Sequence, residues 1–231
     1  MIQAQFIKLR RTPFWWYLIL STIGIIAMFI LYNMIYSWKP LSERLQLLFE
    51  IYGAFLPLLH GLTIFFLINP EEQMANMYEL LSVKNRTGMI LTLMSLVWGI
   101  ESLRMSLVFM SLSMQMGAVI TGYQILLFVV GEMIISILSI VFHLWMNLKF
   151  GVAVSMFFAT LELLQSVMYS NISIVGGWKY LPTAWAMEWK SDVVNLTWNS
   201  QLLFWRNCVL IIILATAVIA FWFYRWEGRR K

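Results

Sequence analysis

The stretch 14-FWWYLILSTIGIIAMFILYNMIY-36 contains no charged residue and is long enough to cross a lipid bilayer as one helix. About 20 consecutive apolar residues span the hydrocarbon core of a bilayer. The rest of the chain is similar, because 61% of its 231 residues are hydrophobic and only 12% are charged, whereas soluble domains carry about 25% charged residues. The sequence therefore predicts an all-α integral membrane protein with one transmembrane domain over 1–231.

Apolar runs like the first one recur along the chain and predict six transmembrane helices. Only helices are expected, because the alternating pattern of a membrane barrel is absent. Lys and Arg concentrate near the two termini and in alternate loops, which places both termini in the cytoplasm. The predicted spans are at about 14–36, 51–69, 88–112, 117–146, 150–170 and 202–224.

The residues before the first span mix apolar and basic side chains. Over about 2–12, Ile2, Phe6, Ile7 and Leu9 can share one side of a helix, while Lys8 reaches toward the headgroups. This pattern predicts a short interfacial helix on the inner leaflet. The alternative is a basic flank that only sets the orientation of the chain.

The segment 69-NPEEQMANMYELLSVKNR-86 is strongly polar, although it lies between the second and third spans. Asn69 is a suitable N-cap and Pro70 suits the first helical position, so a cytoplasmic helix is predicted over about 70–86. Such a helix either lies against the leaflet or the protein's own bundle, or docks a partner. Its candidate partner-binding residues are Glu71, Glu72, Met74, Met77, Tyr78 and Leu81.

The outer segment of about 171–201 is rich in aromatic residues, which prefer the membrane–water interface. Its Gly176–Gly177 pair and Pro182 argue against one continuous helix. Two interpretations remain open: an aromatic belt that anchors the loop, or a surface for a membrane-bound substrate. The candidates for that surface are Trp178, Tyr180, Trp185 and Trp189.

No motif predicts an enzyme or a nucleotide-binding site. The phosphate-binding sequence G-x-x-x-x-G-K-[ST] is absent, and the basic residues do not form the array that nucleic acid would need. Cys208 is the single cysteine, so no disulfide within the chain and no thiolate metal cluster is possible. His60 and His143 are far apart in the sequence, each near the end of a predicted span, and are expected to be hydrogen-bonded interior residues rather than metal ligands.

Four ionisable residues inside the predicted spans are the intramembrane polar candidates, because such residues usually face protein or water. Glu101 and Arg104 are three residues apart, so they are expected to pair near the outer end of the third span. Glu132 and Glu162 lie near the middle of the fourth and fifth spans. Either could line a polar path, bind a cation or relay protons, or could be protonated and hydrogen-bonded within the bundle.

The organisation of the chain resembles the permease subunit of type-2 ABC exporters. The resemblance rests on the opening 8-KLRRTP-13, six spans, and an acidic amphipathic helix after the second span. Within that class, 177-GWKYLPTAWAMEW-189 is similar to a stretch of lantibiotic immunity permeases. The matching residues are Trp178, Lys179, Tyr180, Leu181, Pro182 and Trp185, whereas Glu188 stands where a basic residue is common.

The resemblance implies a multi-pass transport subunit of the bacterial cell membrane that binds no cofactor itself. Two copies of a separate ATPase, holding ATP and Mg, would dock on 70–86, and a second permease chain, identical or a sister, would complete the transporter. The cargo would be a membrane-active, amphipathic or cationic antimicrobial peptide, taken from the membrane lipid and expelled. Alternative functions are binding or sequestration of a peptide or lipid without ATP, and proton-coupled secondary transport.

Overall fold

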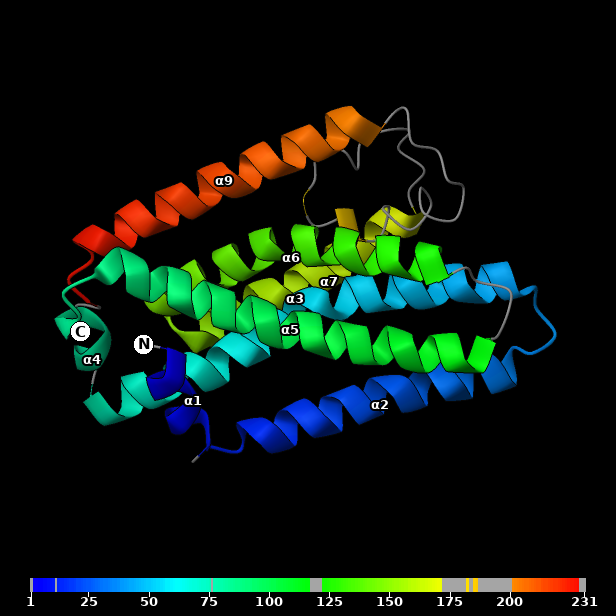
Figure 1. Cartoon of the computed structure of the whole chain (residues 1–231), viewed down its shortest axis with the longest axis horizontal. Helices are drawn as coiled ribbons and strands as arrows, with labels where there is room; N and C mark the ends of the chain where they lie inside the picture. The colour runs from blue at the N-terminus through cyan, green and yellow to red at the C-terminus, as the bar shows by residue number, and fades with distance from the viewer. Residues whose placement is uncertain are drawn as a thin grey trace.

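The computed structural model describes residues 2–10, 12–75, 77–116, 122–171, 182, 185–186 and 201–228. Within these ranges the chain is all-helical, and the long helices run alongside one another as a bundle (Figure 1). Both termini lie at the same end of the bundle, together with α1 and α4; we call this the terminal end. The helices are α1 (Ile2–Arg10), α2 (Phe14–Ile35), α3 (Leu41–Ala75), α4 (Tyr78–Ser82), α5 (Arg86–Met116), α6 (Gly122–Phe150), α7 (Val152–Asn171) and α9 (Gln201–Arg225).

Five of the described helices are long and apolar enough to cross a membrane, which confirms a helical protein of multi-pass membrane character. These segments are Phe14–Ile35, Glu43–Gln73, Arg86–Met114, Ile125–Phe150 and Phe204–Arg225. The span predicted at 150–170 corresponds to α7, whose 20 residues measure about 30 Å at 1.5 Å per residue, close to the hydrocarbon thickness. Its described side chains extend only to Met168, and α7 is not among the five helices named above. A sixth span therefore stays a prediction.

Helix α3 differs most from the sequence-based prediction. The second span was predicted to begin at about residue 51, but α3 begins at Leu41 and continues for 35 residues through Pro57 and Pro70. The helix begins earlier because Leu45, Leu48, Phe49 and Tyr52 recur at helical spacing and bury one face against the bundle. Pro57 is tolerated because its neighbours in the bundle hold the helix in place after the loss of one backbone hydrogen bond.

The predicted cytoplasmic helix over 70–86 is divided into two parts. Its first residues are the last turns of α3, which ends at Ala75, so Pro70 is an interior residue and does not start a helix. Met77 then adopts a left-handed conformation with φ 66°, and its N–H donates to the Glu71 carbonyl at 3.0 Å. The five-residue α4 follows, with Leu80 fully buried. The chain turns here because Met77 and Leu80 both reach the bundle core.

Two apolar clusters fill the bundle, one toward each end. The cluster at the terminal end includes Leu9, Ile64 and Phe223, and the cluster at the opposite end includes Phe49 and Cys208. Along α3, the second cluster ends at Leu56 and the first begins at Ile64. The residues between these two points include the buried polar side chains of His60 and Thr63.

Candidate functional site

A layer of buried polar residues lies between the two apolar clusters. We call it the polar layer and define it as the buried residues His60 and Thr63 of α3, Glu101 and Arg104 of α5 and Ser136 of α6, together with the partly buried Ser139 of α6. Polar and charged groups at this depth of a membrane bundle are costly and are usually functional. The layer has two halves that share α3 and differ in their surroundings.

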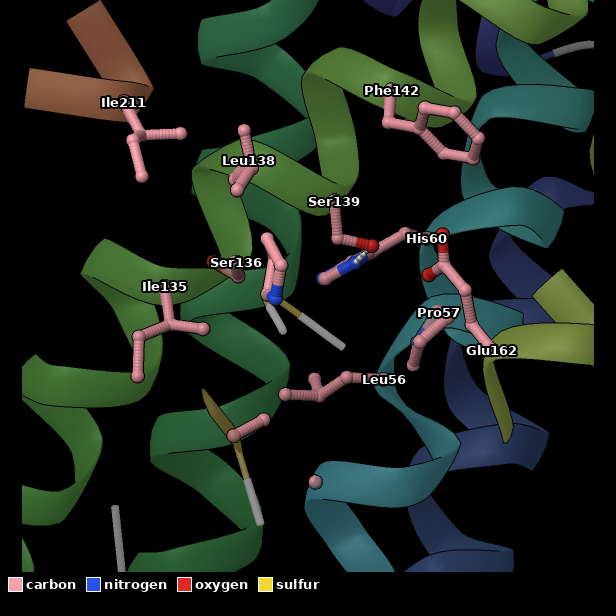
Figure 2. Close-up of a pocket in the computed structure, with 13 residues that line it drawn as sticks. Leu56, Pro57, His60, Ile135, Ser136, Leu138, Ser139, Phe142, Glu162 and Ile211 are labelled. Atoms are coloured by element: carbon pink, nitrogen blue, oxygen red, sulfur yellow. Dashed lines mark hydrogen bonds between the residues drawn. The ribbon is translucent and has the colours of Figure 1, made fainter. Parts of the chain in front are cut away.

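The first half of the polar layer borders a cavity of about 330 Å³ between α3, α6, α7 and α9, shown in Figure 2. The His60 Nδ1 lies 3.0 Å from Ser139 Oγ. In Figure 2, His60 and Glu162 lie on one side of the cavity, and Ile135 and Ile211 lie on the other. The cavity is therefore an apolar chamber with one polar wall.

Glu162 reaches this polar wall from α7 and is held by a histidine. Its Oε2 lies 3.3 Å from His143 Nε2, and His143 is further held by Ser155 Oγ, which lies 3.4 Å from its Nδ1. The side chain of Glu162 keeps 14% of its surface exposed, whereas His143 is fully buried. The arrangement can present a carboxylate to the cavity while its orientation is fixed from behind.

The structure confirms that both histidines are hydrogen-bonded interior residues, but corrects the position of His60. Each histidine was expected near the end of a span, whereas His60 lies near the middle of α3. Among the described residues, no group of three or more His, Cys, Asp or Glu could hold a metal ion.

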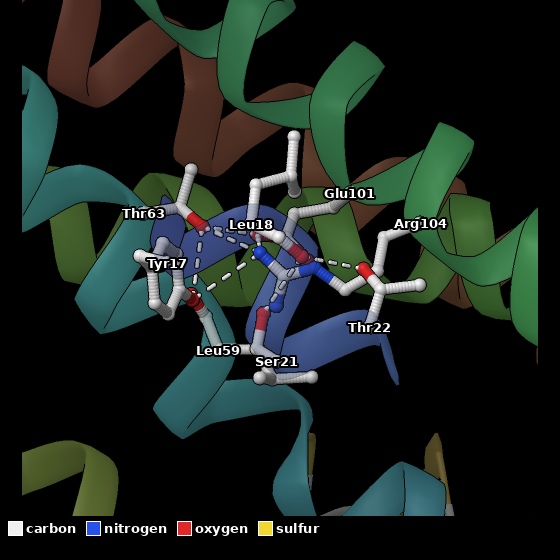
Figure 3. A network of polar contacts seen from close by, with 8 residues as sticks. All are labelled: Tyr17, Leu18, Ser21, Thr22, Leu59, Thr63, Glu101 and Arg104. Carbon is white, nitrogen blue, oxygen red and sulfur yellow. Dashed lines mark hydrogen bonds and ion pairs between the residues drawn. The ribbon is translucent and has the colours of Figure 1, made fainter. Parts of the chain in front are cut away.

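The second half of the polar layer is a closed network around Arg104 (Figure 3). The Nη2 of Arg104 donates to Glu101 Oε1 and to Thr63 Oγ1, both at 3.1 Å, and to the Tyr17 hydroxyl at 3.2 Å. Thr63 Oγ1 also donates to Glu101 Oε1. Tyr17 donates to the Leu59 carbonyl at 3.1 Å. The network joins α2, α3 and α5 around one buried ion pair.

The predicted pairing of Glu101 with Arg104 is thus confirmed, although its position is corrected. The pair lies at the middle of α5 and not near its outer end, because α5 continues to Met116. Both side chains are fully buried, at 0% and 1% exposure. Loss of either partner would leave an uncompensated buried charge. This half of the layer therefore stabilises the packing of α2, α3 and α5, and we call it the brace.

Glu132 of α6 is completely buried, and neither of its carboxylate oxygens has a hydrogen-bond partner among the described residues. The Tyr52 hydroxyl is likewise buried and unpartnered in that part of the chain, and it lies within electrostatic range of Glu132. The two groups come from facing helices, since α3 and α6 pack together. Glu132 is therefore a polar group that local structure does not explain.

The candidate partner-binding residues at the end of α3 mostly face the protein itself. Glu71 is 4% exposed and forms an ion pair with Lys8 of α1. Met77 is 3% exposed and belongs to the apolar cluster at the terminal end, against which Leu81 also packs. Glu72 is partly buried. The side chains of Met74 and Tyr78 lie outside the described residues.

The interfacial helix predicted over 2–12 corresponds to α1. Its Leu9 is buried in the terminal cluster, whereas Phe6 and Ile7 are exposed at 42% and 65%. The apolar residues were expected on one side, but Leu9 packs inward and the other two point outward because α1 lies on the bundle. The outward pair remains available for lipid.

Of the outer aromatic candidates, Trp178, Tyr180 and Trp189 lie outside the described residues. Trp185 is 1% exposed and packs edge-on against Phe204, with 5.6 Å between ring centroids. It therefore belongs to the apolar cluster at the end opposite the terminal end and not to an exposed surface. The close approach of this segment to α3 requires Gly53, because a Cβ there would lie 3.0 Å from the Ala186 carbonyl oxygen.

Sequence reasoning missed the residues that connect the candidates. Thr63 and Tyr17 complete the Arg104 network, and Ser139 and Ser155 hold the two histidines. The one available signal was the i, i+3 spacing of His60 and Thr63 on an otherwise apolar helix, which puts two polar groups at one depth. Their partners lie too far away in the sequence to be paired by any local rule.

No protein-family model matches this sequence, and comparisons with curated proteins and with solved structures found no match either.

Proposed function

We propose that this chain is the permease subunit of an ATP-driven ABC exporter in the bacterial cell membrane. Two copies of a separate ATPase subunit bind at the terminal end, and a second permease chain, identical or a sister, completes the transporter. The cargo is a membrane-active cationic peptide, which is expelled from the membrane. The proposal starts from the resemblance in the sequence and from the absence of a phosphate-binding motif in the chain.

The distribution of basic residues supports a cytoplasmic location of the terminal end. Lys and Arg near membrane-spanning helices favour the cytoplasmic side. At this end they occur on α1, at the α4–α5 junction and at the ends of α6 and α9. The residues concerned are Lys8, Arg10, Lys84, Arg86, Lys149 and Arg225.

The main support for the proposal is a set of contacts that join separate segments at the terminal end. Lys8 of α1 forms an ion pair with Glu71 of α3. Arg86 donates from Nη2 to the Leu81 carbonyl at 3.1 Å and from Nη1 to the Trp226 carbonyl at 2.8 Å, which joins α4, α5 and the residues after α9. We call these joined segments (α1, α4 and the residues after α9) the platform. Because the platform is connected to several helices, it can transmit a movement of a bound ATPase into the bundle.

Glu71 and Met77 are buried and Leu81 packs against the terminal cluster, which revises the residues that would touch the ATPase. In this proposal these three side chains hold the segment to the bundle, and exposed neighbours contact the ATPase. Gln73 precedes α4 in the sequence, Lys84 follows it, and both are exposed.

Site-specific photo-cross-linking in native membranes tests the proposal. In a Cys208→Ala background, Lys84→Cys is labelled with a benzophenone maleimide; Ser37→Cys, exposed at the opposite end of the bundle, is the matched control. We expect irradiation to link Lys84→Cys, but not Ser37→Cys, to a protein that also reacts with 8-azido-ATP. If neither position captures a nucleotide-binding protein, or both capture the same one, the proposed docking is wrong.

A second candidate function, proton-coupled transport, is favoured by the buried Glu132 and by the pairing of Glu162 with His143. A carboxyl that is buried without a partner is a natural proton carrier in a membrane bundle. Uptake or export in ATP-depleted vesicles under an imposed pH gradient, abolished by Glu132→Gln, would support this function. Transport that needs ATP and continues in Glu132→Gln would contradict it.

A further inference from the structure

Two cavities lined by described residues are similar in size but differ in chemistry. The cavity beside His60 measures about 330 Å³, and a second one between α5, α6 and α9 measures about 310 Å³. The second is lined by apolar residues together with Ser95, Thr216 and Trp98, and no ionisable side chain is among its described lining residues. The first contains Glu162, so charge is what distinguishes the two.

Glu162 is the single carboxylate on the wall of the first cavity, and neither Lys nor Arg is among its described lining residues. One oxygen of Glu162 is held by His143, while Oε1 has no hydrogen bond to the described residues. A carboxylate facing an apolar chamber has lost most of its hydration, so a cation placed beside it would be strongly favoured.

The neighbouring groups add acceptors around the same wall. His60 is fully buried and its Nδ1 lies 3.0 Å from Ser139 Oγ, so the histidine fixes the orientation of this hydroxyl. Ser139 Oγ has a further lone pair of its own. A primary ammonium offers three N–H donors and one positive charge, and Glu162 and Ser139 are acceptors for it among the described lining residues.

The remainder of the cavity is suited to a hydrocarbon chain. Leu56, Leu138 and Phe142 line it, and its volume falls within the range of small-ligand sites. Ile211 is 39% exposed, so the cavity reaches the lateral surface of α9, where a membrane-dissolved ligand can approach. A ligand with an ammonium head and a flexible alkyl chain can bind the polar wall with its head and the apolar lining with its chain.

We propose that this cavity binds an amphipathic primary ammonium, with the ammonium on Glu162 and Ser139 and the alkyl chain against Leu56 and Phe142. A lysine side chain of a membrane-active peptide has this chemistry. The assignment of the cavity as the substrate site of the exporter rests on the proposed function, whereas binding of the ammonium does not require an ATPase.

Binding of radiolabelled n-octylammonium to the purified full chain in lipid nanodiscs tests the proposal, with uptake by empty nanodiscs subtracted. We expect saturable binding that unlabelled n-octylammonium displaces and that n-octanol and octanoate, of equal chain length, do not. Glu162→Gln should weaken binding at least tenfold, and Glu162→Asp should weaken it less. Glu132→Gln, a buried carboxylate outside the wall of this cavity, should leave it unchanged.

Two cavity-filling variants separate loss of the site from a general disturbance. Ser136→Leu fills the first cavity and should abolish binding, whereas Thr216→Leu fills the second and should preserve it. Only variants with the wild-type unfolding temperature are compared. Absence of saturable binding to the wild type, equal displacement by n-octanol, or unchanged binding in folded Glu162→Gln would overturn the proposal. Cross-linking of Lys84→Cys to an ATPase is independent of these results, so the two proposals fail separately.

Discussion

The two halves of the polar layer lie three residues apart on α3, at His60 and Thr63, yet they have opposite character. Around Thr63, a cation and an anion of the protein form a buried ion pair. Around His60, a carboxylate faces an open chamber, and it is tied to a histidine that has no fixed charge. The difference indicates that a buried charge in this bundle stabilises the fold where the protein itself supplies the opposite charge. Where the protein supplies no opposite charge, the buried charge is available to a ligand.

The largest expected effect comes from breaking the brace. Arg104→Met leaves Glu101 buried without its cation, so the free energy of unfolding should fall by about 3–5 kcal/mol. Titration with sodium dodecyl sulfate in mixed micelles, followed by far-UV circular dichroism, measures this change. The double variant Glu101→Met/Arg104→Met removes both charges and should recover most of the loss. A double variant as unstable as Arg104→Met would show that the pair does not act as a brace.

A smaller loss of stability is expected when the wall of the first cavity is overpacked. Gly53→Val places side-chain atoms against the Ala186 backbone, where a Cβ alone would lie 3.0 Å from the carbonyl oxygen. Overpacking of this kind costs about 1–3 kcal/mol. The same micelle titration measures it, with Gly24→Val as the control because a Cβ there meets nothing within 4 Å. Equal stabilities of the two variants would mean that residue 186 does not pack closely on α3.

Glu132 extends the comparison to a carboxyl without any described partner. Glu132→Leu removes two buried unpartnered oxygens, so the free energy of unfolding should rise, by about 1 kcal/mol. Glu101→Leu is the comparison, and it should destabilise because Arg104 then loses its anion. A clear loss of stability in Glu132→Leu would mean that Glu132 has a partner within the folded protein.

The smallest effect is expected at the terminal end. Lys8 keeps 32% of its side chain exposed, so solvent screens its ion pair with Glu71. Lys8→Gln should lower the free energy of unfolding by about 1 kcal/mol or less. Protease digestion of the N-terminal residues should accelerate, because α1 is then held less firmly; Arg10→Gln, which is exposed, is the control. Unchanged digestion in Lys8→Gln would show that packing of Leu9 alone holds α1 in place.

Much of the helical organisation could be predicted from the sequence, because it depends on long apolar runs. The first predicted span, 14–36, nearly coincides with Phe14–Ile35, since few of its residues are buried against other helices and local hydrophobicity sets its bounds. The prediction was wrong where tertiary contacts override local signals. Pro70 reads as a helix start in isolation, yet α3 continues through it, and Met77 ends the segment by entering the core.

The candidate site was predictable only in part, for the same reason. The pairing of Glu101 with Arg104 follows from a spacing of three residues on one helix. The contacts of Glu162 with His143 and of His60 with Ser139 do not, because each joins different helices.

By itself, the sequence determined that this is a helical membrane protein with rare charges inside its apolar segments. Hydrophobicity and charge are properties of each residue, and lipid selects for them directly. Only the tertiary structure decided which charges meet. Packing of α5 against α2 and α3 closes Arg104 into a brace, whereas packing of α6 and α7 around His60 leaves Glu162 beside a cavity.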